Sequence, residues 1–166
     1  FAFFRNIFFN SKFISDSFNR ENKSNYSFFP LPADNDKLEK ITSIVKSKRN
    51  FSYFFAFDPS SFETRKNPMA VVKAFIRLNK KISNISLIIK VNTLYNINKD
   101  LLRLIKSNSN INLVSGFLSD DEYIKLLNSI NTFVSLHRAE GFGRNIYEAL
   151  YLGKDIVCSD YGGNKD

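Results

Sequence analysis

The sequence predicts an α/β protein built on a doubly wound, Rossmann-like parallel sheet. From residue 51 onward, apolar runs of four to seven residues alternate with amphipathic stretches of about ten residues, which is typical of βα units. The apolar runs are near-continuous, as expected for strands whose sheet is covered by helices on both faces. We therefore expect five parallel strands, separated by helices.

The expected strands lie at 51–57, 86–91, 111–114, 131–136 and 154–159. The first helix should begin at Asn67-Pro68, since Asn is a good N-cap and Pro suits the first helical position. Ser119 and Glu122 have the spacing of a capping box, which predicts a helix from there to about residue 128. Further helices are expected at 98–107 and 144–152, the second ending at a C-cap glycine, Gly153.

Residues 1–50 have a different pattern. It predicts short strands at 7–9 and 27–29, a short helix at 11–18, a proline-rich connection at 30–32, and a helix at 34–48 capped by Asp34 or Asn35. We place a boundary near residue 33, which separates a segment 1–33 from a domain 34–166.

Composition excludes several classes of protein. The chain has 166 residues, of which 43% are hydrophobic and 24% charged, which is ordinary globular usage and argues against a disordered or collagen-like chain. Cys158 is the single cysteine, so a disulfide scaffold is excluded and a reducing compartment is favoured. No apolar run has the roughly 20 residues that a membrane-spanning helix needs. The chain begins at Phe1 rather than Met, and we expect it to be an internal piece of a longer protein.

The net charge of +8 is concentrated in residues 51–110, which carry ten Lys and Arg against three acidic residues. Such a region attracts nucleic acid, an anionic membrane or a phosphorylated small molecule, although a solvated basic surface is the ordinary interpretation. We expect no nucleic-acid partner, because the aromatic residues lie in apolar strand runs and no recognition motif is present.

Ligands of open parallel sheets bind where strands end and helices begin. In the loop 58–67, adjacent Arg65 and Lys66 precede a helix and form a candidate phosphate clamp, with a solvated pair as an equal alternative. In the loop 135–143, Gly141 and Gly143 allow the backbone to approach an anion closely.

Glu148 lies inside the helix that follows Gly143, among apolar residues. Its carboxylate could reach the strand-end crevice and accept hydrogen bonds from two hydroxyl groups. The alternative is an ordinary surface glutamate, which is the usual role of a lone Glu. His137 has no second His or Cys nearby, so we expect no zinc site there. A hydrogen-bonded loop imidazole explains His137 at least as well as a general base.

Together these residues resemble a known family. The stretch Glu140-Gly-Phe-Gly-Arg-Asn-Ile-Tyr-Glu148 is an E-x7-E motif, and Gly162-Gly163 follows it. The motif together with this glycine pair resembles the C-terminal, donor-binding domain of retaining GT-B glycosyltransferases of the family 4 type, also called glycosyl transferases group 1. Arg65-Lys66-Asn67-Pro68 resembles that family's phosphate-contacting loop, and the resemblance extends over nearly the whole chain.

The resemblance implies a truncated C-terminal half of a GT-B fold. Residues 1–33 would be the tail of the N-terminal acceptor domain with its hinge, and residues 34–166 would be the nucleotide-sugar-binding domain, incomplete at its C-terminus. The implied activity is transfer of a sugar from a nucleoside-diphosphate sugar, with retention of anomeric configuration. A non-catalytic nucleotide-binding Rossmann-like module is the alternative.

The resemblance also implies roles for single residues. The catalytic residues would be Glu140, Arg65 and Lys66. The donor-binding residues would be Gly141, Phe142, Gly143, Glu148, His137, Arg138 and Leu118, with Glu148 on the ribose and Leu118 near the nucleobase. No metal or other cofactor is expected. Asp58 departs from the pattern, since many relatives have a basic residue there, and so does Arg144, where an apolar residue is common.

The implied partners are a nucleotide sugar, a saccharide or lipid-linked acceptor, and the protein's own N-terminal domain. We expect a cytoplasmic enzyme of polysaccharide biosynthesis, with peripheral contact at the inner membrane face as a further option. The piece itself should bind donor without turning it over.

Overall fold

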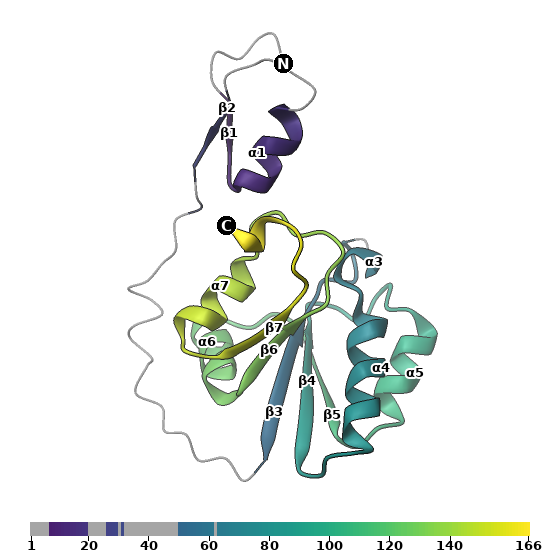
Figure 1. Ribbon diagram of the computed structural model, residues 1–166. Coiled ribbons are helices and arrows are strands. Elements are labelled where there is room, and N and C mark those ends of the chain that lie inside the picture. Colours follow the sequence, from purple (N-terminus) through teal and green to yellow (C-terminus); the bar gives the residue numbers. More distant parts are fainter. Residues whose placement is uncertain (1–6, 20–25, 30, 32–49, 62) are drawn as a thin grey trace.

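The computed structural model describes residues 7–19, 26–29, 31, 50–61 and 63–166. Its main sheet has five parallel strands in the spatial order β5-β4-β3-β6-β7 (Figure 1). The strands are β3 (Phe51–Ala56), β4 (Ile85–Val91), β5 (Ile111–Ser115), β6 (Thr132–Ser135) and β7 (Asp155–Cys158). The predicted α/β class and parallel sheet are confirmed, with each strand boundary within two residues of its expected place.

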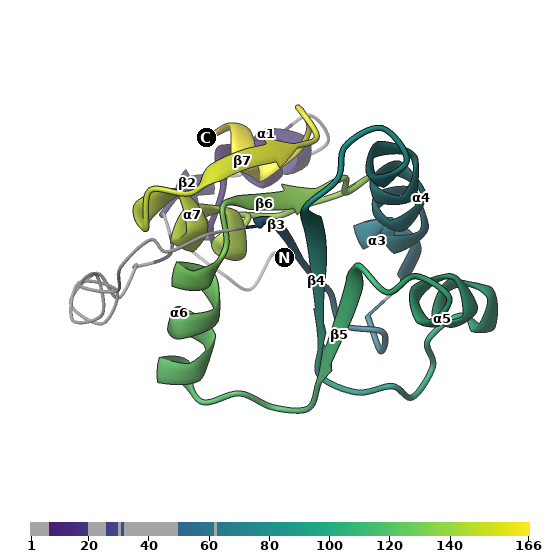
Figure 2. The same ribbon diagram turned by 90° about the horizontal axis from the view of Figure 1, so that it is seen from below.

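Helices cover both faces of this sheet. They are α3 (Glu63–Lys66), α4 (Pro68–Asn79), α5 (Lys99–Lys106), α6 (Asp120–Ser129) and α7 (Arg144–Tyr151). The views in Figures 1 and 2 place α4 and α5 on one face, and α6 and α7 on the other. No helix among the described residues is long and apolar enough to cross a membrane.

Two apolar cores flank the sheet, and β3 contributes to both. Successive side chains of a strand point to opposite faces, so Phe55 packs with residues of α4 and α5 while Phe54 packs with residues of α6 and α7. Both rings are fully buried. Since burying a Phe side chain stabilises a fold by about 1.5–3 kcal/mol, this strand anchors both layers.

The predicted starts of α4, α5, α6 and α7 are confirmed, and the side chains at two of these starts act as caps. Asn98 caps α5 by accepting the amides of Asp100 and Leu101 at 2.9 and 3.1 Å. Ser119 and Glu122 form the expected capping box at α6.

The prediction for Asn67 is wrong in one respect. Its side chain makes no cap bond, and its backbone is left-handed with φ 54°. Asn tolerates this conformation better than most residues, and here it turns the chain from α3 into α4. The polar stretch 58–66, expected as a loop, contains α3. That helix buries no residue, so it has no apolar periodicity by which to be predicted.

A small unit precedes the main sheet. It pairs β1 (Ile7–Phe9) with β2 (Tyr26–Phe28) in parallel, with α1 (Lys12–Asn19) between them, close to the expected elements. The start of α1 lies against the C-terminal 3-10 turn η1 (Gly163–Lys165) (Figure 1). The amides of Lys12 and Phe13 donate to the Asp166 carboxylate at 2.6 and 3.3 Å. The expected helix at 34–48 and the boundary near residue 33 lie outside the described residues.

Candidate functional site

A pocket of about 490 Å³ opens at the carboxyl edge of the sheet. It is bounded by the loops after β3, β4 and β5 and by residues of α3, α6 and α7. Its charged lining residues are the cations Arg65, Lys66, Lys90 and Arg144 and the acids Asp58, Asp120 and Glu148. Cations at this edge of a parallel sheet suit an anionic ligand.

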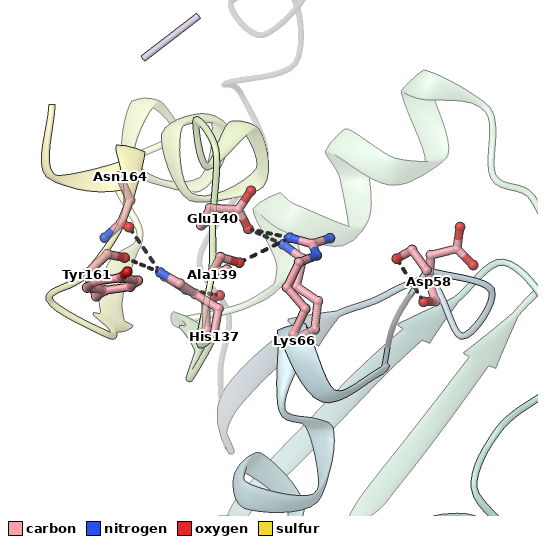
Figure 3. A network of polar contacts seen from close by, with 10 residues as sticks. Asp58, Lys66, His137, Ala139, Glu140, Tyr161 and Asn164 are labelled. Carbon is pink, nitrogen blue, oxygen red and sulfur yellow. Dashed lines mark hydrogen bonds and ion pairs between the residues drawn. The ribbon is translucent and has the colours of Figure 1, made fainter. Parts of the chain in front are cut away.

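At one end of this pocket, Lys66 forms an ion pair with Glu140. The Lys66 and Glu140 side chains are 16% and 12% exposed, so the pair is largely shielded from water. Arg65 also reaches Glu140, with 3.5 Å between Nη1 and Oε2, and donates to the carbonyl of Ala139 at 3.2 Å. Figure 3 shows Lys66 directed toward the Glu140 carboxylate, with Asp58 standing apart.

A smaller cavity of about 90 Å³ involves the same pair, and is lined by Lys66, Glu140 and Gly143 together with the first residues of α7. Gly143 has φ 86°, and a Cβ there would come within 3.2 Å of Asn164. Only glycine fits this turn without strain. The turn brings the N-terminus of α7 to both cavities, since Arg144 and Asn145 line each of them.

On α7, Glu148 lines the large pocket and accepts a hydrogen bond from Arg144 Nε at 3.0 Å. The Glu148 side chain is 17% exposed and that of Arg144 is 67% exposed. The i,i+4 spacing places both side chains on one face of the helix. Glu148 therefore lines the pocket with a largely covered side chain, rather than standing on the outer surface.

Lys90 is a buried cation that the sequence analysis did not single out. Its ammonium donates to the carbonyls of Val91 at 2.9 Å and Gly116 at 2.7 Å and to Asn92 Oδ1 at 3.0 Å. All three donors are thereby used, and burial lowers the pKa of the Lys90 side chain from its ordinary 10.5. Lys90 ties the end of β4 to the loop after β5. The sequence does contain a signal for this buried cation, because a lysine stands inside the otherwise apolar run 86–91.

His137 lies outside the lining of the large pocket, and it is 2% exposed. Its Nε2 lies 2.8 Å from the Tyr161 carbonyl and 3.0 Å from Asn164 Oδ1, and its Nδ1 lies 2.9 Å from the Ser135 hydroxyl. Figure 3 shows the ring directed toward Tyr161 and Asn164, away from Lys66. In this arrangement the imidazole joins the loop after β6 to the loop after β7.

Arg138 also points elsewhere. Its Nη1 donates to the Thr64 carbonyl at 3.4 Å, and it lines a separate cavity of about 270 Å³ with residues of α3 and the start of α4. Its backbone amide donates to the Arg65 carbonyl at 2.8 Å. Through that bond, the loop that carries Glu140 is attached to α3.

The predicted site residues thus fall into three groups. Those lining the large pocket are Arg65, Lys66, Leu118 and Glu148. Those lining the adjoining cavity with Lys66 are Glu140 and Gly143. Those lining neither are Gly141, Phe142, His137 and Arg138. Within the described part of the chain, no group of three His, Cys, Asp or Glu residues is arranged to hold a metal ion.

The family model for glycosyl transferases group 1 matches residues 39–166. Among curated proteins, none matches the sequence significantly.

Solved structures share the fold at low identity. A glycosyltransferase from Rickettsia africae ESF-5 aligns with a TM-score of 0.80 and 14% identity, covering 96% of this chain and 45% of that one. A structure described as trehalose-6-phosphate from E. coli bound with UDP-2-fluoro glucose aligns with a TM-score of 0.73 and 9% identity, covering 97% and 47%. An α,α-trehalose 6-phosphate synthase from Burkholderia multivorans gives 0.72 and 10%, covering 96% and 46%. This chain spans less than half the length of each of these.

Proposed function

Since this chain belongs to the glycosyl transferases group 1 family, we propose that it binds a nucleoside-diphosphate sugar. This nucleotide sugar is the donor in a reaction that transfers its sugar with retention of anomeric configuration. Its sheet is that of the Rossmann-like C-terminal half of the GT-B fold. A similar structure is described with UDP-2-fluoro glucose bound, which supports a nucleotide sugar as the donor class.

One observation carries the proposal: Lys66 and Glu140, from separate loops, meet where the two cavities adjoin. A cation is needed for the diphosphate and a carboxylate for sugar hydroxyls, and here each neutralises the other. On donor binding, the diphosphate takes Lys66 and Arg65 as partners. Glu140 then accepts hydrogen bonds from hydroxyls of the donor sugar.

The chemistry follows from these positions. When the bond between the anomeric carbon and the diphosphate breaks, negative charge grows on the leaving phosphate oxygen. Once Lys66 and Arg65 have turned from Glu140 to the diphosphate, they and the amides at the start of α7 stabilise that charge. Glu148 accepts hydrogen bonds from hydroxyls of the ribose, and the loop that contains Leu118 lies next to the nucleobase. Since the side-chain cations serve the diphosphate, we expect donor binding to persist in EDTA.

The first test measures binding of UDP, GDP and dTDP to the 166-residue protein by thermal unfolding and by calorimetry. A ligand at a hundredfold excess over its Kd stabilises the folded state by about 2.7 kcal/mol, which raises the Tm by several degrees at this size. Glu148→Gln should remove the shift. Asp160→Asn, at a side chain 88% exposed, is the matched control and should keep it.

Two outcomes would contradict the proposal. One is a protein that unfolds cooperatively and responds to none of the three nucleotides. The other is strong, salt-dependent binding of an oligonucleotide with no nucleotide response, which would indicate a nucleic-acid binder. Turnover distinguishes an enzyme from a nucleotide-binding module: in the complete polypeptide, Glu140→Gln should abolish transfer while nucleotide binding remains.

A further inference from the structure

Tyr123 carries a buried hydroxyl that no described residue satisfies. The ring lies on α6, lines the large pocket and packs near Phe54, with 6.3 Å between ring centroids. Its Oη is closed to solvent and has no hydrogen-bond partner among the described residues. Buried hydroxyls are nearly always hydrogen-bonded, and leaving one unpaired costs about 1–3 kcal/mol. Packing alone would be served better by Phe, so the hydroxyl needs another explanation.

The surroundings of this hydroxyl indicate what it can do. Burial and the negative charge of Glu148 raise the pKa of the Tyr123 phenol, and Arg144 opposes them less strongly. The phenol therefore keeps its proton at neutral pH and is a hydrogen-bond donor. Beside it stands a carboxylate, which only accepts. A hydroxyl, which donates and accepts at once, matches a neutral donor next to an acceptor.

Access to the hydroxyl depends on Arg144. Its side chain lines the same pocket, bonds Glu148 and is 67% exposed, so it can move into solvent at small cost. An anionic ligand in the pocket would draw the guanidinium away from Glu148, since both would compete for it. That movement would open the Glu148 end of the pocket, where Tyr123 lies.

We propose that the Tyr123 hydroxyl donates a hydrogen bond to a ribose hydroxyl of the bound nucleotide while Glu148 accepts from the same diol, so that the site selects ribonucleotides over deoxyribonucleotides. This inference rests on the proposed function, because it needs a nucleotide in the pocket. It adds a specificity-determining residue on α6 to the carboxylate on α7.

The test compares how the affinity for a nucleotide changes when Tyr123→Phe is introduced, when one ribose hydroxyl is removed, and when both changes are made. UDP, GDP and their 2′-deoxy and 3′-deoxy analogues are titrated calorimetrically against the wild type and the variant. Tyr123→Phe should weaken the preferred ribonucleotide about 3- to 10-fold, the range of one hydrogen bond. The same substitution should leave one of the two deoxy analogues unaffected, which identifies the hydroxyl that Tyr123 contacts. Tyr53→Phe, on β3 and outside this pocket, is the matched control and should change nothing.

Stability provides an independent readout. Because Tyr123→Phe removes an unsatisfied polar group and keeps the ring, the free variant should melt at the wild-type temperature or above it. A variant that is less stable without ligand would show that the hydroxyl has a structural partner, which overturns the inference.

The binding outcomes also separate the two proposals. If the wild type binds UDP or GDP, and Tyr123→Phe weakens ribo- and deoxyribonucleotides equally or not at all, the inference fails while the proposed function stands. If the wild type binds dTDP but neither UDP nor GDP, the inference fails while the proposed function stands. If it binds none of the three nucleotides, both fail.

Discussion

Lys66 and Glu140 are 74 positions apart in the sequence and form an ion pair at one end of the candidate donor pocket. The pair joins α3 to the loop after β6. Because both side chains are largely buried, removing one of them leaves a poorly solvated charge, whereas removing both does not.

The first prediction concerns this pair. Lys66→Met and Glu140→Gln should each destabilise the protein, and the double variant should lose less than the sum of the two single losses. A coupling of about 1–3 kcal/mol is expected for groups in direct contact. Urea unfolding of the four proteins measures it, and strictly additive losses would show that the two residues do not interact in solution.

The second prediction concerns the cap of α6. Ser119→Ala removes a hydroxyl that makes two hydrogen bonds with Glu122. The hydroxyl donates to the Glu122 carboxylate at 2.7 Å and accepts from the Glu122 backbone amide at 3.3 Å. The loss should be about 1 kcal/mol at pH 7. Ser129→Ala, at the other end of the same helix, should change stability by less than about 0.5 kcal/mol.

The cap should also be pH-dependent, because hydrogen bonds from the Ser119 hydroxyl and amide hold the pKa of Glu122 below its ordinary 4.5. A carboxyl group with a lowered pKa stabilises the fold fully above its unfolded value and loses that effect as the pH falls through the folded value. The difference between wild type and Ser119→Ala should therefore shrink below about pH 4.5. A difference that stays constant down to pH 3 would contradict this assignment.

A third prediction concerns Gly163, whose amide donates to the Glu140 carbonyl at 2.8 Å. A Cβ at this position would overlap the backbone of Gly141, so Gly163→Ala must displace the loop that carries Glu140. We expect a loss of about 3 kcal/mol and nucleotide binding at least tenfold weaker. Gly153→Ala is the control: it has φ 66° but open space around it, and should cost about 1 kcal/mol with binding unchanged. Equal effects of the two substitutions would show that the overlap is relieved elsewhere.

The fourth prediction concerns the His137 imidazole. Its Nε2 faces two oxygen acceptors, because Asn164 Nδ2 donates to the Ser159 carbonyl at 3.0 Å and so turns its Oδ1 toward the ring. The neutral ring should therefore carry its proton on Nε2 and accept from Ser135 at Nδ1. Nitrogen-15 NMR of the imidazole distinguishes the tautomers, and a proton on Nδ1 would require Asn164 to be flipped.

How far the sequence predicts this structure depends on the kind of signal. The strands and the larger helices follow from periodicity and capping, and Ser119 with Glu122 behaves as its spacing predicts. The short helix α3 has no buried residue, and Asn67 uses its tolerance of a left-handed backbone rather than its capping oxygen. Neither property is visible in a hydrophobic pattern.

The site was predictable in part for similar reasons. Lys66, Glu140 and Glu148 belong to motifs, and the structure places them at or between adjoining cavities. Tyr123 belongs to no motif. Its hydroxyl is buried where α6 packs against Phe54 of β3, and such isolation is a tertiary property that one segment of sequence does not encode.

The central position of β3 also has a consequence during synthesis on the ribosome. β3 pairs with β4, which follows it closely in the chain, and with β6, whose Thr132 lies opposite Tyr53. A nascent chain that has emerged as far as β5 can close the core around Phe55, but α6 and α7, which pack on the face with Phe54, appear only later. The half-made protein therefore exposes the apolar sheet face that these helices later pack against, the kind of surface that chaperones bind and that drives aggregation.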